Sequence, residues 1–312
     1  MIDKRNVVLI GATGLIGRQL VYALIERGFR PVVLSRNSSK AKGLFDTDVD
    51  VVSWNGNDKG YLTELLNGTK AVINLAGESI ASRWTSRRRE LILRSRVDTT
   101  SAIAIAIEQC SDPPDVFIQA SAIGFYPFNS NLPIDERGLP GEGFLSKVVM
   151  QWEQAAVKAG AKSRLVIIRT GVVLAPDGGF LSKIATPIRL FIGGWFGDGS
   201  QILSWIHVED HVRAICFLLE NDKCRGIYNL VSTNPTSIKV FVRRVGALLN
   251  CPVWLPIPTF VLKLIFGRMA EEVILSSQNI TPKRLIQAGF SFDFTSVEVA
   301  LKDLLNKKNI AK

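Results

Sequence analysis

The sequence has few cysteines, few histidines and no long uninterrupted apolar run. Its 312 residues include four cysteines and two histidines. The cysteines stand far apart without a C-x-x-C pair, which argues against a disulfide framework or a cysteine zinc site and predicts reduced thiols. The longest apolar stretch, Val253–Phe266, is broken by Pro256, Pro258 and Lys263 and is too short to cross a bilayer. No signal peptide is expected, because the first residues lead directly into an apolar strand. These absences predict a cytoplasmic protein with no integral membrane segment.

Acidic residues are outnumbered by basic ones, giving a formal net charge of +10. Half of the excess lies between Arg83 and Arg96, where six arginines stand with one acid, Glu90. Most of these arginines are typical of a solvated helix face, and a phosphate-bearing ligand is the alternative interpretation. Nucleic-acid binding is not expected, because Trp84 is the one aromatic residue among them.

Apolar β-type runs alternate with helix-type segments through the first half of the chain. The runs lack polar alternation, as expected for strands buried on both faces of a parallel sheet. This alternation predicts an α/β fold with a Rossmann-type doubly wound parallel sheet. The predicted strands are Asn6–Ile10, Pro31–Leu34, Val49–Ser53, Ala71–Asn74, Val116–Ala120 and Leu165–Thr170, and the predicted helices are Leu15–Arg27, Thr85–Gln109 and Phe144–Ala159.

Two parts of unequal size are expected. Residues 1–175 are predicted to form the nucleotide-binding Rossmann domain, with elements returning to it at about 205–232. Beyond about Pro176 the pattern loosens into glycine-punctuated loops, short helices and a proline-rich segment. Residues 176–312 are therefore predicted to form a smaller substrate-side region packed on the sheet.

The motif GATGLIG, residues 11–17, directly follows the first strand and opens the first helix. Glycines at these positions allow a tight turn and let the backbone approach a pyrophosphate, while the helix N-terminus offers unpaired N–H groups to the anion. In this strand–turn–helix context the motif predicts dinucleotide binding. The expected cofactor-binding residues here are Gly11, Thr13, Gly14, Leu15, Ile16 and Gly17.

The ends of the second and fourth strands refine this prediction. An acid after the second strand would accept the ribose 2′-hydroxyl of NAD, but the chain has Ser35 and Arg36, which suit a 2′-phosphate. NADP(H) is therefore favoured over NAD(H). The alternative interpretation is that Arg36 is an ordinary exposed arginine at the end of a strand. At the fourth strand, small residues leave space beside the ligand crevice: Asn74, Leu75, Ala76 and Gly77.

With GATGLIG, NLAG (74–77), SAIGFY (121–126) and WIHVEDH (205–211) in this order, the chain resembles extended short-chain dehydrogenases/reductases of the epimerase-like family 39U. The resemblance covers essentially the whole chain, including a small C-terminal domain of unknown function at 249–297. It implies that NADP(H) contacts Ser35 and Arg36, that Leu75 and Ala76 line the crevice, and that Arg96 and Val173 approach the dinucleotide. It also implies a link to cell or plastid division, while the family's substrate is not established. Helices 85–110 and 144–159 could pair subunits as a homodimer.

The usual catalytic pair of this superfamily is missing. A Tyr-x-x-x-Lys arrangement lets a phenolate exchange the proton while the lysine lowers its pKa. Here Phe144 and Val148 stand in those places, and Lys147 is one position off, about 100° around a helix. Ser121 matches the usual serine position and Tyr126 is the one phenol near the predicted site. They are the catalytic candidates, and a packing role for Tyr126 is the equal alternative.

The segment His207–His211 places two histidines four residues apart. Its order, H-x-E-D-H, differs from the H-E-x-x-H order that binds zinc beside a glutamate base, so no metal site is predicted. Two functions stay open. One is an NADP(H)-dependent oxidoreductase or epimerase acting on a small molecule, possibly nucleotide-sugar-like. The other is a catalytically impaired NADP(H)-binding regulatory protein, for example in cell division.

Overall fold

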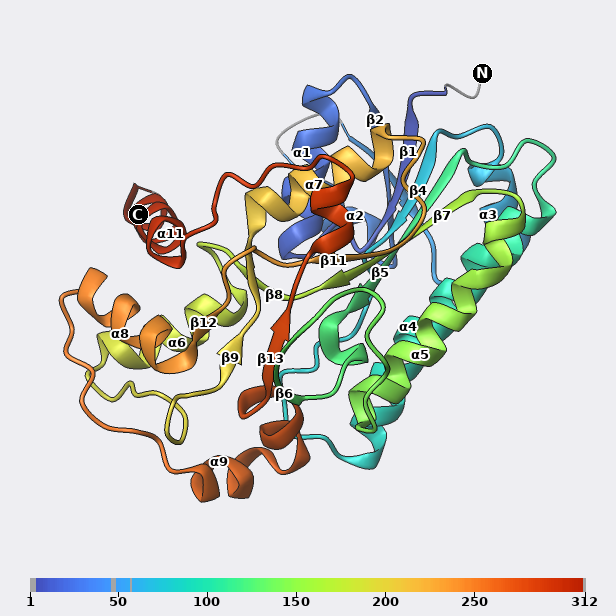
Figure 1. Ribbon diagram of the computed structural model, residues 1–312. Helices are drawn as coiled ribbons and strands as arrows, with labels where there is room; N and C mark the ends of the chain where they lie inside the picture. Colours follow the sequence, from blue (N-terminus) through green and yellow to red (C-terminus); the bar gives the residue numbers. More distant parts are fainter. Residues whose placement is uncertain (1–3, 46–48, 57, 311–312) are drawn as a thin grey trace.

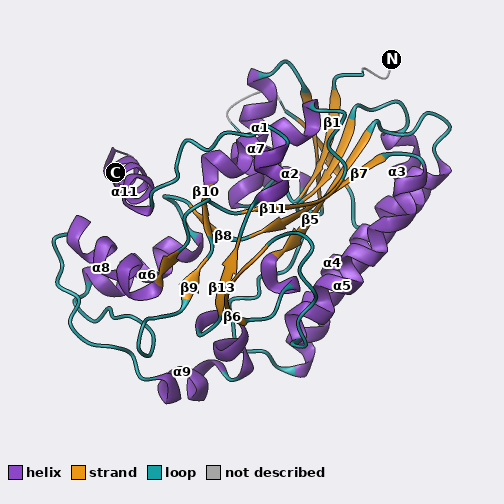
Figure 2. Ribbon diagram, viewed as in Figure 1, coloured by secondary structure: helices purple, strands orange, loops and turns teal. Residues whose placement is uncertain are grey.

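The computed structural model describes residues 4–45, 49–56 and 58–310, and its centre is a seven-stranded parallel sheet (Figures 1 and 2). The strand order is β11-β7-β5-β4-β1-β2-β3, and every neighbouring pair in it runs parallel. The strands are β1 (Asn6–Ile10), β2 (Arg30–Ser35), β3 (Asp50–Ser53), β4 (Ala71–Asn74), β5 (Val116–Ala122), β7 (Arg164–Thr170) and β11 (Gly226–Leu230).

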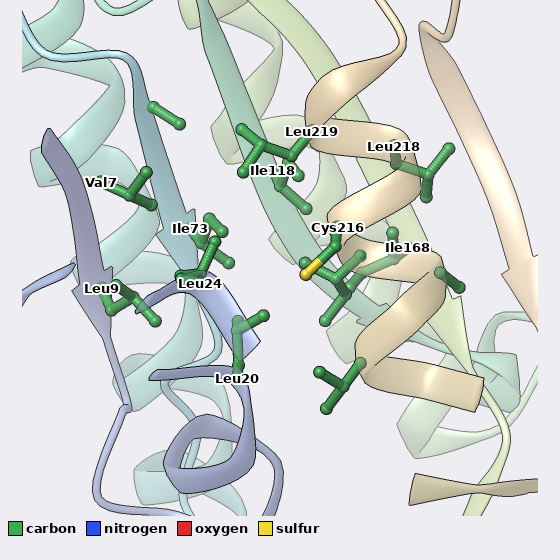
Figure 3. Packing of buried hydrophobic residues seen from close by; sticks show 14 of the residues in the cluster. Val7, Leu9, Leu20, Leu24, Ile73, Ile118, Ile168, Cys216, Leu218 and Leu219 are labelled. Atoms are coloured by element: carbon green, nitrogen blue, oxygen red, sulfur yellow. The ribbon is translucent and has the colours of Figure 1, made fainter. Parts of the chain in front are cut away.

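Helices cover both faces of this sheet, which is why most residues of its central strands are apolar. On one face, α1 (Leu15–Glu26) and α7 (Val208–Glu220) pack over β1, β4, β5 and β7, as Figure 3 shows for Leu24, Cys216 and Leu219. On the other face lie α3 (Lys59–Leu66), α4 (Ser86–Gln109) and α5 (Phe144–Ala156). Their small and branched residues, among them Leu62, Ala102 and Ala106, are fully or almost fully buried.

The predicted α/β fold with a doubly wound parallel sheet is confirmed. All six predicted strands are present, two of them with the predicted bounds, and β5 runs two residues further, to Ala122. The three predicted helices are also present, although the last turn of the third is a separate 3₁₀ helix, Val157–Ala161. Short helix α2 (Ser38–Lys42) follows β2.

The rest of the chain forms a smaller region beside the carboxyl ends of the strands. Its core joins α6 (Gly179–Arg189), α8 (Ile238–Leu248) and α11 (Val297–Ile310). Three small sheets pair β8 (Val172–Leu174) with β10 (Trp205–His207), β9 (Ile202–Leu203) with β12 (Thr236–Ser237), and β6 (Asn129–Ile134) with β13 (Ser277–Ile280). The remaining helices are α9 (Thr259–Phe266), α10 (Lys283–Gln287), the 3₁₀ turn Ile123–Phe125 and the π-helical turn Ala270–Ile274. Among the described residues, no helix has both the length and the apolar character needed to cross a membrane.

Candidate dinucleotide site

The strand order reverses between β1 and β4, and in sheets of this kind ligands bind beyond the carboxyl ends of the strands at that point; we call this position the crevice. The loop after β1 can occupy this crevice only with glycine at two positions. A Cβ on Gly11, whose φ is +84°, would lie 2.7 Å from the carbonyl carbon of Leu75. A Cβ on Gly17 would lie 2.5 Å from the Cα of Ala12. Both distances are shorter than real contacts allow, so the loop, the β4 end and the start of α1 are packed backbone against backbone.

Helix α1 opens into this crevice. Gly14 is its N-cap and has no side chain that could satisfy the first N–H groups of the helix. Thr13 and Gly14 are exposed, and Leu15 and Ile16 are half-buried. The free N–H groups and the positive end of the helix dipole are therefore directed at the crevice, which suits a pyrophosphate.

Val173 lies beside the start of α1. A Cβ on Gly179 would lie 3.2 Å from Cδ2 of Leu15 and 3.7 Å from the carbonyl oxygen of Val173. Strand β8 and the turn at Gly178 and Gly179 thus form the side of the crevice opposite β4. The structure brings Val173 to the glycine loop, although the two are far apart in the sequence.

The end of β2 presents the two residues predicted to read a 2′-phosphate. The Ser35 hydroxyl both accepts from the backbone N–H of Asn37 and donates to its carbonyl, each at 3.2 Å, so the hydroxyl fixes the turn. Arg36 is exposed, and within the described ranges its guanidinium has no ion-pair partner. A phosphate arriving here would meet a cation that none of the described carboxylates neutralises.

Asn74 organises the other wall. It is fully buried, and its Nδ2 donates to Oγ1 of Thr100 at 3.1 Å and to Oε1 of Gln119 at 3.0 Å. Its Oδ1 accepts from the N–H of Ala76 at 3.1 Å, while the N–H of Leu75 donates to the carbonyl of Ile10 at 2.8 Å. The Asn74 side chain therefore shapes the loop that packs on Gly11.

Arg96 supplies a fixed positive charge next to Gly77. Its Nη1 donates to the carbonyls of Glu78 and Ile92, each at 3.0 Å, and its guanidinium lies 5.0 Å from the centre of the Trp152 ring. A Cβ on Gly77 would lie 3.0 Å from this guanidinium, so the glycine makes room for it. Burial lowers the pKa of Arg96 to about 10, against an opposing effect of Glu78, which leaves it cationic at neutral pH.

The two catalytic candidates belong to a buried polar network that sequence reasoning missed. The Ser121 hydroxyl donates to Oε1 of Glu153 at 2.6 Å. Arg169 donates to the same carboxylate through two nitrogens, Nε to Oε1 and Nη2 to Oε2, each at 2.8 Å. The side chains of Arg169 and Glu153 are only 3% and 11% exposed. The sequence does contain a signal for this network: Arg169 and Glu153 are charged, although each lies in a segment that is otherwise mostly apolar.

Tyr126 closes the same network. Its hydroxyl donates to Oδ1 of Asn229 at 2.8 Å and accepts from Nη1 of Arg169 at 3.0 Å, and the residue is 1% exposed. Burial raises the pKa of Tyr126, and the charge and hydrogen bond of Arg169 oppose that rise. The phenol is thus held neutral with both of its hydrogen-bonding positions in use.

The start of α5 confirms that no phenol–lysine pair stands there. Phe144 packs edge-on against Trp84, with ring centres 5.0 Å apart. Val148 is buried in the same cluster, whereas Lys147 points to the exposed side of the helix. The carboxylate of Glu272, from the C-terminal region, accepts from the N–H of Leu145 at 3.0 Å and so caps this helix.

The segment His207–His211 ties the two regions together. His207 caps α7 through a 3.1 Å bond from the N–H of Glu209, and its Nε2 lies 3.2 Å from Asp303 of α11. Asp210 accepts from the backbone N–H groups of Asp293 and Phe294 at 3.0 and 2.8 Å. In the described part of the chain no three His, Cys, Asp or Glu side chains converge as a metal site would require.

Comparison with known proteins places this geometry in a family. Residues 7–230 match the NAD dependent epimerase/dehydratase family, and residues 257–304 match a domain of unknown function, DUF1731. Epimerase family protein SDR39U1 homolog, chloroplastic, from Arabidopsis thaliana is 35% identical over 97% of this chain and 87% of its own length. Epimerase family protein SDR39U1 from Bos taurus is 32% identical over 96% of this chain and 99% of its own.

A solved structure agrees with these relatives. The crystal structure of human epimerase family protein SDR39U1 (isoform 2) with NADPH has a TM-score of 0.86 and 29% identity, and the match covers 96% of this chain and 99% of that one. UDP-glucose 4-epimerase from Thermotoga maritima, at 19% identity and a TM-score of 0.77, shares the fold. The resemblance inferred from GATGLIG, NLAG, SAIGFY and WIHVEDH is confirmed. The chain belongs to the NAD dependent epimerase/dehydratase family.

Proposed function

We propose that this protein binds NADP(H) in preference to NAD(H) and acts as an oxidoreductase or epimerase on a small molecule, with nucleotide sugars as the first candidates. The observation that carries the proposal is the glycine loop. It is packed against the β4 end so closely that only hydrogen fits at Gly11 and Gly17, and it leaves the start of α1 open to an anion. The human relative whose structure contains NADPH adds support.

Several parts of this cofactor have residues in the structure that would hold them. The N–H groups at the start of α1 would hold the pyrophosphate, with Thr13 beside them, and Arg36 would pair with the 2′-phosphate. Leu75, Ala76 and Gly77 would line the wall near Arg96. Bound NADP(H) supplies or accepts a hydride at its nicotinamide. The charge of Arg96 would then favour an oxyanion developing beside Gly77.

We further propose that proton transfer involves the Tyr126 network. Tyr126 would act as the proton donor, with Ser121 and Glu153 fixing the position of Arg169 behind it. The phenol has a cation within hydrogen-bonding distance, as the missing lysine would have provided. Exchange with a substrate would require the 1% exposed hydroxyl to leave Asn229.

The first experiment is a titration with NADPH and NADH followed by nicotinamide fluorescence. Wild type should bind NADPH at least about tenfold more tightly, equivalent to about 1.4 kcal/mol, and Arg36→Ala should remove that preference. Arg30→Ala, at the opposite end of β2, is the matched control and should retain it. Equal binding of both nucleotides by wild type would refute the 2′-phosphate assignment.

The second candidate is a regulatory protein that uses NADP(H) as a bound ligand, for example in cell division. The burial of Tyr126 and the absence of a phenol–lysine pair on α5 favour it. Turnover should be screened as NADPH oxidation with small carbonyl compounds and, because epimerisation consumes no net cofactor, by product analysis with nucleotide sugars. If Tyr126 transfers the proton, Tyr126→Phe should lower turnover at least about 100-fold, whereas Tyr61→Phe, on the exposed side of α3, should not. A protein that binds NADPH but turns over nothing in this screen favours the regulatory role.

A further inference from the structure

Helix α9 is an apolar helix that no part of the described chain fully covers. Its sequence, TFVLKLIF, contains one charged residue, yet only Leu262 is buried. Phe260 and Leu264, four residues apart and so on one side of the helix, are 69% and 74% exposed. A helix apolar on nearly all sides is normally enclosed by protein or lipid. In Figure 1 this helix lies at the lower end of the molecule, away from the sheet.

Two loops extend the same surface. The turn after α6 and the segment before α9 run side by side, because the N–H of Ile257 donates to the carbonyl of Trp195 at 2.7 Å and the N–H of Gly197 donates to the carbonyl of Ile257 at 2.9 Å. Each carries large apolar side chains that are more than half exposed. Together with α9 they form the apolar tip, which we define as Leu190, Phe191, Ile192, Trp254, Leu255, Phe260, Leu264 and Ile265.

The backbone of the tip is strained where it presents these side chains. Phe191 has a φ of +60°, a left-handed conformation that bulky residues rarely adopt. Its side chain is 68% exposed, so no internal packing offsets the strain. This conformation closes α6 as a Schellman motif, in which the N–H of Phe191 donates to the carbonyl of Ile188 at 2.9 Å and the N–H of Ile192 donates to the carbonyl of Pro187 at 3.0 Å. The motif leaves Leu190, Phe191 and Ile192 together at the end of the helix, each more than half exposed.

The segments that build the tip carry positive charge and no acids. None lies between Asp177 and Asp198, or between Asp222 and Glu271. Lys239 and Arg243 of α8 sit over the Trp195 ring, each 5.0 Å from its centre, which brings two cations to the loop. Two of the acidic residues that end these segments already have partners. Glu271 pairs with Lys263 at 2.9 Å, and Asp198 accepts a hydrogen bond from Ser200. The basic residues of α6, α8, α9 and the turn after α9 are Lys183, Arg189, Lys239, Arg243, Arg244, Lys263 and Arg268, of which Arg244 pairs with Glu298 of α11 at 3.6 Å.

We propose that the apolar tip docks on an anionic lipid bilayer. Its aromatic and aliphatic side chains enter the interfacial layer while the surrounding lysines and arginines face the headgroups. Side chains that project from two loops and a helix need no complementary protein cavity, and a fluid layer can surround each of them. The acid-free flanks match a negative surface. This inference is independent of the proposed NADP(H) chemistry.

The protein contains a built-in probe for this contact. Of its six tryptophans, five are at most 7% exposed, whereas Trp254 is 75% exposed and lies in the tip. Transfer of Trp254 into lipid should shift the fluorescence maximum to shorter wavelength. The full chain should be mixed with vesicles of phosphatidylcholine alone or of phosphatidylcholine with phosphatidylglycerol, and the bound fraction measured by sedimentation. Binding and the shift are expected with the anionic vesicles and should weaken as salt is added.

The variant Phe260→Glu/Leu264→Glu should lower the bound fraction at least about tenfold. Both positions are exposed, and an unchanged thermal unfolding profile will confirm that the variant folds. Ile286→Glu, on α10 and 49% exposed, is the matched control and should bind as wild type does. Trp254→Phe should keep binding and lose the fluorescence shift. Absence of binding to anionic vesicles, or equal binding by the tip variant, would overturn the proposal. Self-association that the tip variant abolishes, without vesicle binding, would instead identify the tip as a contact between copies.

Discussion

Removing one partner of the Arg169–Glu153 pair should destabilise this protein far more than removing both. The pair is almost completely buried and joined by two 2.8 Å hydrogen bonds. Glu153→Leu leaves an uncompensated guanidinium in the interior, and Arg169→Met leaves an uncompensated carboxylate. Either change should cost about 3–5 kcal/mol of the free energy of unfolding, because a lone buried charge keeps its desolvation penalty without its attraction.

The double variant Glu153→Leu/Arg169→Met removes both charges together. Its main remaining cost is the Ser121 hydroxyl, which loses its acceptor, at about 1–3 kcal/mol. Tyr126 keeps Asn229 as its acceptor in all three variants. The double variant should therefore be more stable than either single variant, with a coupling energy of at least about 3 kcal/mol.

Urea unfolding followed by far-UV circular dichroism measures this cycle, without nicotinamide nucleotide, since a bound ligand would add its own stabilisation. Surface pairs provide the contrast: Glu90 and Arg94, one turn apart on α4 and both more than half exposed, should show a coupling of at most about 1 kcal/mol. If the losses of the two single buried variants simply add in the double variant, the reasoning about buried charge is refuted.

Two further predictions concern the loop and a buried histidine. Gly17→Ala should abolish NADPH binding in the fluorescence titration while the chain still folds, because the new methyl group would push α1 off the loop at Ala12; retained affinity would contradict the packing argument. Burial lowers the pKa of His211 to about 3, so the unfolded chain binds a proton near its ordinary pKa of about 6.5 that the folded chain does not. Stability should fall by up to about 1.4 kcal/mol per pH unit as pH drops from about 6.5 toward 3, and urea unfolding of His211→Gln should show a shallower decline.

The fold could be predicted from the sequence because its signals are local. A strand buried on both faces is apolar at most positions, so β1 and β4 could be delimited from five and four consecutive residues, although Asn74 at the end of β4 is polar and fully buried. The glycine loop could be predicted equally well, because a positive φ and a close backbone contact both require a residue without a side chain. The wall formed by Asn74 could not be anticipated in the same way, because its partners Thr100 and Gln119 are distant in the chain.

The polar network at the end of β5 was hidden for the same reason. Ser121 and Tyr126 were singled out by position in the chain, which gives proximity to the sheet end but not the direction of a side chain. Ser121 points toward α5, where Glu153 holds it, and Tyr126 points inward to Asn229. Arg169 joins both, and its place on β7 became informative only once the sheet had brought β5 and β7 together.

The crevice therefore has one end that is intact and one that is altered. At the proposed adenosine end, the glycine loop is packed against the β4 end and the start of α1, and Arg36 is exposed after β2. At the other end, α5 contributes Phe144 and Val148 to an apolar cluster and uses Trp152 and Glu153 for buried hydrogen bonds. With no phenol–lysine pair on α5, a reaction here would depend on hydride transfer, on fixed charge and on the proposed proton transfer from Tyr126. Arg96 is held beside Gly77 by two backbone carbonyls and remains cationic at neutral pH. Helix α5 offers no phenol that could titrate. A search for the substrate should therefore start from the position of Arg96.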